Sequence, residues 1–143
     1  MHHHDPTIIA PAIVRTFYDR IWNAGALDAA NDLLATDFAF RGSPGPETYG
    51  RTAFCDYVRS VRTALANYRC DILDCVTEGE KVFAKMRFSG THVGVFRGFQ
   101  PSGKTVQWLG AALFRTQAHR IVQLWVLGDL AALDETLRKN AAD

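Results

Sequence analysis

The stretch from Val82 to His92 alternates apolar and polar residues more regularly than any other part of the chain. Because successive side chains of a strand point to opposite faces, this pattern predicts a half-buried strand with His92 on its buried side. Similar alternation predicts strands over Tyr68–Val76, Thr105–Thr116 and Ile121–Leu127. A turn at Glu78-Gly79-Glu80, the loop FRGFQPSGK at 96–104 and a tight turn near Ala118 and His119 would join these strands into an antiparallel meander.

The first half of the chain follows helical spacing instead. Apolar residues recur every three or four positions in 8–23 and 51–66, and a short helix is expected over 27–34. A strand over 38–42 and a proline- and glycine-rich loop over 42–50 separate them, and a last helix covers 130–140. Helices followed by a run of strands predict an α+β fold: a curved antiparallel sheet with helices packed on its concave face.

Length and composition restrict the class of protein. The 143 residues favour one domain, with 48% hydrophobic and 22% charged residues as in ordinary globular proteins. The net charge of +1 is spread without a basic stripe, and no apolar run reaches the roughly 20 residues of a membrane span, so we expect neither nucleic acid nor membrane as a partner.

The N-terminus and the cysteines carry no site in our interpretation. Residues 1–7, with His2, His3 and His4, are predicted to be a disordered or tag-like segment before a single domain over 8–143, and we expect no metal site. The start, MHHHDPT, lacks the basic-then-apolar layout of a secretory signal, so we do not expect it to act as one. Three cysteines without a CxxC pair favour a reducing, cytoplasmic location.

Two predicted strands suggest a pocket on the concave side. Trp108, Gly110, Ala112 and Phe114 share one face, and two small residues between two aromatic ones leave room for a ligand. A helix packed directly onto Gly110 and Ala112 is the alternative. On the next strand Gln123, Trp125, Leu127 and Asp129 share a face if the strand stays regular to its end, so the polar groups of His92, Gln123 and Asp129 are expected to reach one hollow. The alternatives are that His92 only bonds a neighbouring carbonyl at the rim and that Gln123 faces solvent.

Asp129 has two interpretations. It directly precedes the helix LAALDETL, where aspartate is a favoured N-cap, although Ala132 occupies the position of a capping-box glutamate. Alternatively, burial against Trp108 and Trp125 would raise its pKa and make it a general base. The sequence leaves both open.

Two motifs resemble those of a known family. They are G-T-H-x-G-x-F-x-G at Gly90–Gly98, followed by P-S-G-K at Pro101–Lys104, and W-x-x-x-D at Trp125 and Asp129. The chain resembles the SnoaL-like polyketide cyclases of the nuclear transport factor two-like superfamily, over nearly its whole length. The resemblance implies a cone-shaped α+β fold and a small-molecule pocket.

The resemblance also implies chemistry without a cofactor. Asp129 would remove a proton alpha to a carbonyl of a hydrophobic, polyketide-like substrate, and the enolate would close a ring by an aldol step. His92 or the indole of Trp108 would donate to the enolate oxygen. The predicted site comprises Asp129 and His92 as catalytic residues and, for substrate binding, Trp108, Trp125, Gln123, Phe114, Gly110, Ala112, Phe40 and Phe17.

Two other functions are compatible with the same fold. One is an epoxide or lactone hydrolase in which Asp129 activates water with help from Arg41 or Tyr49. The other is a binding or dimerisation module without chemistry, in which Asp129 only caps its helix. A homodimer is expected in each case, because the outer face of an open sheet often needs cover.

Overall fold

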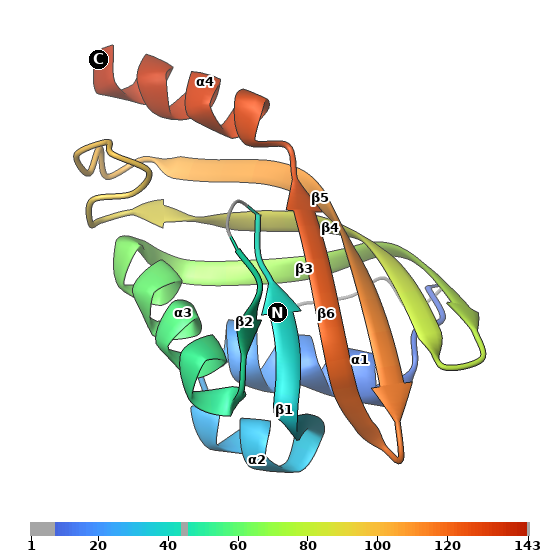
Figure 1. Ribbon diagram of the computed structural model, residues 1–143. Coiled ribbons are helices and arrows are strands. Elements are labelled where there is room, and N and C mark those ends of the chain that lie inside the picture. The colour runs from blue at the N-terminus through green and yellow to red at the C-terminus, as the bar shows by residue number, and fades with distance from the viewer. Residues whose placement is uncertain (1–7, 44–45, 143) are drawn as a thin grey trace.

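A strongly bent sheet wraps around the N-terminal helices and α3, while α4 extends beyond one end of the sheet (Figure 1). The computed structural model describes residues 8–43 and 46–142, so the segment predicted for residues 1–7 lies outside the described residues. The helices are α1 (Ala12–Thr16), continued by a π-helix (Phe17–Asn23), a 3₁₀ turn (Leu27–Ala29) with α2 (Ala30–Leu33), α3 (Arg51–Ala64) and α4 (Leu130–Ala142). The strands are β1 (Leu34–Arg41), β2 (Thr48–Tyr49), β3 (Leu65–Glu78), β4 (Lys81–His92), β5 (Thr105–Gln117) and β6 (Arg120–Gly128).

The α+β class is confirmed, but the sheet is mixed rather than antiparallel. Its strand order is β2-β1-β6-β5-β4-β3. The four strands β3 to β6 form the predicted meander, and β1 pairs with β6 in parallel. A parallel partner is possible because β1 and β6 are far apart in the chain, so no short hairpin dictates their relative direction.

Local chemistry explains most element boundaries. Ala118 and His119 both adopt positive φ, as a tight two-residue hairpin turn requires, and they join β5 to β6 where the sequence predicted a turn. The first predicted helix changes character at Phe17, where α-helix gives way to π-helix. The short strand β2 lies inside the segment that we predicted to be a loop.

The core lies between the concave face of the sheet and the helices. Alternation along β4 holds as predicted, since Val82, Ala84 and Met86 are buried and His92 shares their face. Aromatic rings fill the space above them. Phe17 contacts both Phe54 of α3 and Phe114 of β5, with centroid distances of 5.7 and 5.5 Å.

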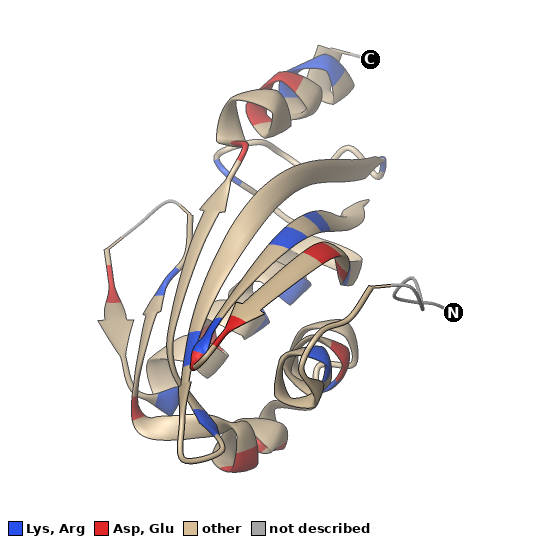
Figure 2. Cartoon of the chain, turned by 90° about the vertical axis from the view of Figure 1, so that its right-hand side faces the viewer, with Lys and Arg blue, Asp and Glu red and all other residues tan. Residues whose placement is uncertain are grey.

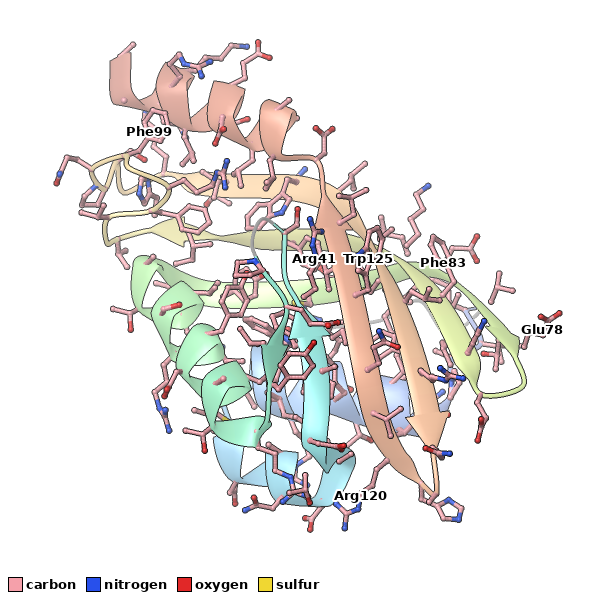
Figure 3. All side chains as sticks on the ribbon, in the orientation of Figure 1. Arg41, Glu78, Phe83, Phe99, Arg120 and Trp125 are labelled. Atoms are coloured by element: carbon pink, nitrogen blue, oxygen red, sulfur yellow. The ribbon has the colours of Figure 1, made fainter. Side chains whose placement is uncertain are left out.

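The outer face of the sheet carries a continuous exposed row. Val76, Phe83, Leu113 and Trp125 are directly paired across β3, β4, β5 and β6. Arg41 of β1 ends the row, with its guanidinium 5.5 Å from the centre of the Trp125 ring (Figure 3). We name these five residues the outer row.

Charged residues of both signs lie on the sheet and on α4 (Figure 2). Positions of acidic and basic residues lie close to each other on neighbouring strands and along α4 (Figure 2). Asp71 of β3, for example, pairs with Arg69 and Arg87. No helix in the described parts of the chain has the length and apolar character that a membrane crossing requires.

The predicted homodimer would bury the outer row. We therefore expect sedimentation velocity to show dimers of the parent chain that dissociate on dilution. Leu113→Glu should shift the equilibrium at least tenfold toward monomer, because it places a charge within an apolar contact. Gln107→Glu, an exposed change on the same face outside the row, is the control. A parent chain that stays monomeric at every concentration would refute the predicted homodimer.

Candidate functional site

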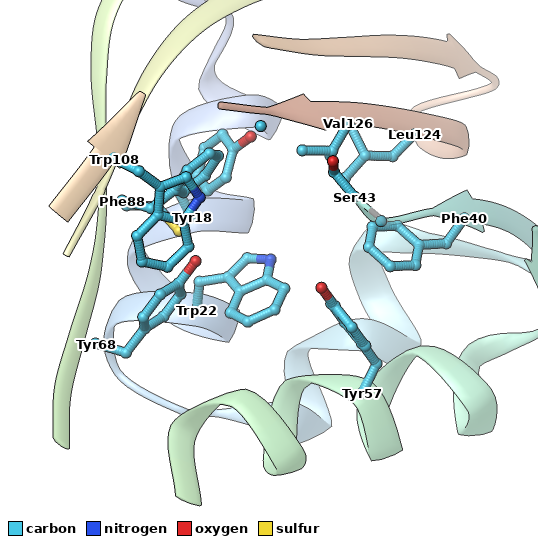
Figure 4. A pocket seen from close by; sticks show the side chains of 13 residues that line it. Tyr18, Trp22, Phe40, Ser43, Tyr57, Tyr68, Phe88, Trp108, Leu124 and Val126 are labelled. Carbon is cyan, nitrogen blue, oxygen red and sulfur yellow. The ribbon is translucent and has the colours of Figure 1, made fainter. Parts of the chain in front are cut away.

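A cavity opens between the helices and the concave face of the sheet (Figure 4). About 50 Å³ of it is accessible to the centre of a water molecule, several times the space that one water needs. Its lining is mostly aromatic, with hydroxyl, thiol and indole groups between the rings. The lining residues are Tyr18, Trp22, Phe40, Gly42, Ser43, Tyr57, Tyr68, Cys70, Phe88, Trp108, Leu124, Val126 and Gly128.

The π-helix supplies one wall through Tyr18 and Trp22. Two contacts fix its C-terminal end. The side chain of Asn23 donates to the carbonyl oxygen of Cys70 at 3.2 Å and accepts from the Cys70 amide at 2.7 Å. Arg62 of α3 donates to the backbone oxygens of Trp22 and Asn23. Such π-helical segments are rare and often occur at functional sites.

Helix α3 and the sheet supply the opposite walls. Tyr57 rises from α3 with its hydroxyl directed into the space between Trp22 and Phe40 (Figure 4). Trp108 of β5 closes the far side, and Gly128 lets its indole approach β6. A Cβ atom at residue 128 would lie only 3.2 Å from the Trp108 Nε1 atom.

Burial keeps the titratable groups of this lining neutral. Desolvation raises the pKa values of Tyr18, Tyr57 and Tyr68 above the ordinary tyrosine value. Desolvation likewise raises the pKa of the Cys70 thiol far above its usual range, although a hydrogen bond from Tyr68 opposes this effect. At neutral pH these groups are therefore hydrogen-bond donors and not proton acceptors.

The hydroxyl of Tyr18 is buried without a hydrogen-bond partner among the described residues. A buried hydroxyl without a partner destabilises a protein by about 1–3 kcal/mol. Since Tyr18 lines the cavity, an oxygen atom of a bound molecule is the kind of partner that this hydroxyl lacks.

The arrangement can therefore bind and polarise, with little capacity to remove protons. None of the described residues that line the cavity is an aspartate, glutamate, histidine, lysine or arginine. Within residues 8–43 and 46–142, no group of three or more His, Cys, Asp or Glu side chains lies close enough to hold a metal ion. The walls of the cavity offer apolar surface and hydrogen-bond donors.

Two of the predicted substrate-binding residues, Trp108 and Phe40, line this cavity. Four others do not line it. The gap expected at Gly110 is filled, because a Cβ atom there would lie 2.6 Å from the Phe88 ring. The other three are Ala112, Phe114 and Phe17, each fully buried outside the cavity.

Gln123 and Trp125 face away from the cavity, which corrects the prediction. They do share a face, but it is the outer one, and Trp125 is 40% exposed. A β-bulge explains the inversion: Arg115 pairs with Gln123 while the next residue, Thr116, pairs with Ile121. The extra residue, Val122, reverses the alternation between Ile121 and the rest of β6.

His92 is buried as predicted but does not line the cavity. Its side chain is nearly inaccessible, at 1% exposure, and its ring packs against Phe96 with a centroid distance of 6.3 Å. Neither ring nitrogen has a hydrogen-bond partner among the described residues. The geometry therefore gives His92 no contact with a molecule in the cavity.

Asp129 caps α4. Its carboxylate accepts a hydrogen bond from the backbone amide of Ala132 at 3.1 Å, and the residue is exposed. This is the N-cap alternative that the sequence offered. The predicted base in the cavity has no counterpart in this arrangement, although Asp129 follows the lining residue Gly128 directly.

The sequence prediction missed most of the aromatic lining. Tyr18 and Trp22 lie four residues apart in a helical segment, a spacing that indicates a shared face. Alternation places Tyr68 on the same face of β3 as Cys70, and Phe88 on the same face of β4 as Met86. These signals identify inward-facing residues, but they do not distinguish a cavity wall from a packed core.

The cap at Asp129 predicts an ordered series of stabilities. Asp129→Ala should lower the free energy of unfolding by about 1 kcal/mol, because it removes the acceptor for the Ala132 amide. Asp129→Asn and Asp129→Ser should retain most of the stability. Urea unfolding monitored by circular dichroism measures the series, and an alanine variant as stable as the parent would contradict the capping role.

The unpaired ring of His92 predicts a stabilising substitution. His92→Leu should leave the free energy of unfolding unchanged or raise it by about 1 kcal/mol, because it removes two buried polar atoms at similar volume. Met86→Ala, which opens a hole in the same face, should instead destabilise by about 2–5 kcal/mol. If His92→Leu destabilised the fold by a comparable amount, His92 would have a partner that this geometry lacks.

Comparisons with known proteins agree with this fold. A protein of Acidithiobacillus ferrooxidans that is assigned as a polyketide cyclase superposes on this chain with a TM-score of 0.81 at 22% identity. The superposition covers 90% of this chain and 94% of that one. IdmH from Streptomyces antibioticus, also assigned as a polyketide cyclase, gives 0.78 at 22% identity and covers 88% and 96%. A protein of ketosteroid isomerase-like fold from Catenulispora acidiphila, in complex with trimethylamine, gives 0.75 at 18% identity and covers 87% and 91%.

These structural similarities show a shared fold. None of the curated proteins matches this sequence. The profile of the SnoaL-like polyketide cyclases, by contrast, matches residues 12–137. The chain therefore belongs to the SnoaL-like polyketide cyclase family.

Proposed function

We propose that this chain binds a hydrophobic, carbonyl-bearing small molecule of polyketide type in the cavity and promotes its ring closure or isomerisation. The observation that carries the proposal is the buried, unpartnered hydroxyl of Tyr18 in an aromatic cavity. A ligand carbonyl that accepts from this hydroxyl would remove its desolvation penalty on binding. Flat rings such as those of Trp22 and Trp108 provide the apolar contact area for the rest of the molecule.

The proposed chemistry requires few protein groups. In an intramolecular aldol reaction, a carbon beside one carbonyl loses a proton. The resulting enolate carbon forms a bond to a second carbonyl carbon, whose oxygen then takes up a proton. Hydrogen bonds from the Tyr18 hydroxyl and from other lining donors would stabilise the negative oxygen of the enolate. The narrow cavity would hold the two reacting carbons close together.

Two groups compete as the acceptor of the proton. Water at the cavity mouth is one acceptor. Asp129 is the other, and as a base it would have to release the Ala132 amide and turn past Gly128 toward the cavity. Asp129→Asn separates the two, since asparagine preserves the cap but cannot take the proton.

Binding without chemistry is the second candidate, and the neutral lining favours it. A hydrolase has less support, because its expected helpers lie elsewhere. Arg41 donates to the Val126 oxygen at 2.9 Å and stacks on Trp125 on the outer face. Tyr49 is 66% exposed and donates to Glu47 at 2.6 Å.

Acetophenone is a suitable probe for the binding step, because it combines one ring with one carbonyl. Fluorescence of Trp22 and Trp108 should report its binding. Tyr18→Phe should weaken acetophenone binding about fivefold, the loss of one hydrogen bond, while leaving ethylbenzene binding unchanged. The same variant should be at least as stable as the parent, because it removes an unsatisfied hydroxyl. Tyr49→Phe is the control.

Two results would contradict this assignment. One is a parent chain that binds neither probe, and the other is a Tyr18→Phe variant that weakens both probes equally. Turnover is tested separately with heptane-2,6-dione, whose aldol closure and loss of water give an ultraviolet-absorbing cyclohexenone. Acceleration by the parent that Tyr18→Phe reduces supports an enzyme. Binding of acetophenone without any acceleration supports the binding module, and loss of acceleration in Asp129→Asn identifies Asp129 as the base.

A further inference from the structure

A second hollow adjoins the cavity. A groove of about 380 Å³ runs between α3, the loop that connects β4 to β5, and the first turn of α4. Four residues line both spaces: Ser43, Tyr57, Tyr68 and Trp108. The two spaces therefore adjoin at these side chains.

The groove differs from the cavity in carrying one charged side chain. Arg97 is the single charged residue among the described residues that line either space. It lies in the tight turn between Phe96 and Phe99, whose backbones bond to each other at 3.0 and 2.9 Å. Its φ of 50° is uncommon for a residue with a side chain, so the loop holds Arg97 in a strained conformation.

Asp134 of α4 fixes the guanidinium of Arg97. The Nε atom donates to one carboxylate oxygen at 2.7 Å and Nη2 donates to the other at 3.0 Å. The side chains are 22% and 31% exposed, so water screens the pair only in part. The remaining nitrogen, Nη1, has no hydrogen-bond partner among the described residues.

This bidentate pair presents hydrogen-bond donors without a net charge. A carboxylate that approached Nη1 would also meet the negative charge of Asp134 and would lose hydration on entering the groove. A neutral acceptor, such as an amide or ketone oxygen, gains the hydrogen bond with much less of either cost. The pair can therefore discriminate between neutral and negatively charged ligands, in addition to joining α4 to the loop.

We propose that Arg97 and Asp134 select ligands whose outer part ends in an uncharged oxygen acceptor and reject those that end in a carboxylate. The inference rests on the proposed function, since it places the inner part of the same ligand in the cavity. In this proposal Arg97 donates a hydrogen bond to the ligand, and Asp134 neutralises the positive charge of Arg97. The expected ligand is therefore elongated, aromatic or otherwise apolar at one end, and neutral at the other.

The test compares probes of the same shape and different charge. These are ω-phenylalkanamides and the matching ω-phenylalkanoates, with three to six carbons in the chain, titrated by calorimetry at neutral pH. The parent should bind the best amide at least tenfold more tightly than its carboxylate. Asp134→Asn should raise carboxylate affinity at least tenfold with little effect on the amide, and added salt should reduce the gain. Arg97→Met should weaken the amide about fivefold.

Controls separate ligand selection from a structural role of the pair. Asp56→Asn removes the same charge from the exposed Arg59–Asp56 pair of α3 and should change neither affinity. A purely structural pair predicts that Asp134→Asn and Arg97→Met weaken amide and carboxylate alike. Circular dichroism verifies folding, and the amide-to-carboxylate ratio of the parent tests the proposal even where a variant fails to fold.

Acetophenone distinguishes the failure of this inference from the failure of the proposed function. If the parent binds acetophenone but shows no preference between amide and carboxylate, the selective role of Arg97 and Asp134 is overturned and the cavity function remains. An unchanged ratio in Asp134→Asn overturns it equally. If acetophenone does not bind at all, the proposed function itself fails.

Discussion

The side-chain amide of Asn23 ties the end of the π-helix to the backbone of Cys70 on β3, and the cavity depends on this contact. An edge strand exposes unpaired backbone groups, and here Asn23 satisfies both the amide and the carbonyl of one residue. Trp22 is thereby held beside Tyr68, with 5.3 Å between ring centroids. Asn23 adds a directional contact to the aromatic packing of Phe17 and Tyr18 on Phe114, and together they set the distance of the helical wall from the sheet.

The chemistry of the cavity follows from how its polar groups are buried. Desolvation keeps the phenols protonated, so the walls offer donors in an environment where each hydrogen bond is stronger than in water. Tyr18 is the extreme case, because its hydroxyl is buried without a partner. A protein that retains such a group sacrifices stability at that position, which is common at functional sites.

The sequence predicted the order of elements well because it depends on local periodicity. The alternation of β4, the helical spacing of α3 and the turn at Ala118 each reflect the backbone geometry of a short segment. The same reasoning reached the two roles of Asp129, and hydrogen-bond geometry separates them in favour of the cap.

The site was less predictable because it depends on register and on distant packing. Alternation along β6 divides its residues into two sets, but the bulge at Val122 decides which set faces inward, and nothing in the sequence marks that bulge. Aromatic character did not predict which face a residue occupies. Trp125 stacks on Arg41 on the outer face, while Trp108 faces the cavity. Whether Gly110 leaves space depended on where the ring of Phe88 settles.

Gly128 has a consequence for how such a chain diversifies. It lines the cavity, precedes the helix cap and lies where any side chain would press on the Trp108 indole. Replacing this one hydrogen with a methyl or larger group would reduce the depth of the hollow and push on the Trp108 ring. Variation at this single backbone position would thus change the size of ligand that the cavity accepts by acting on one of its aromatic walls.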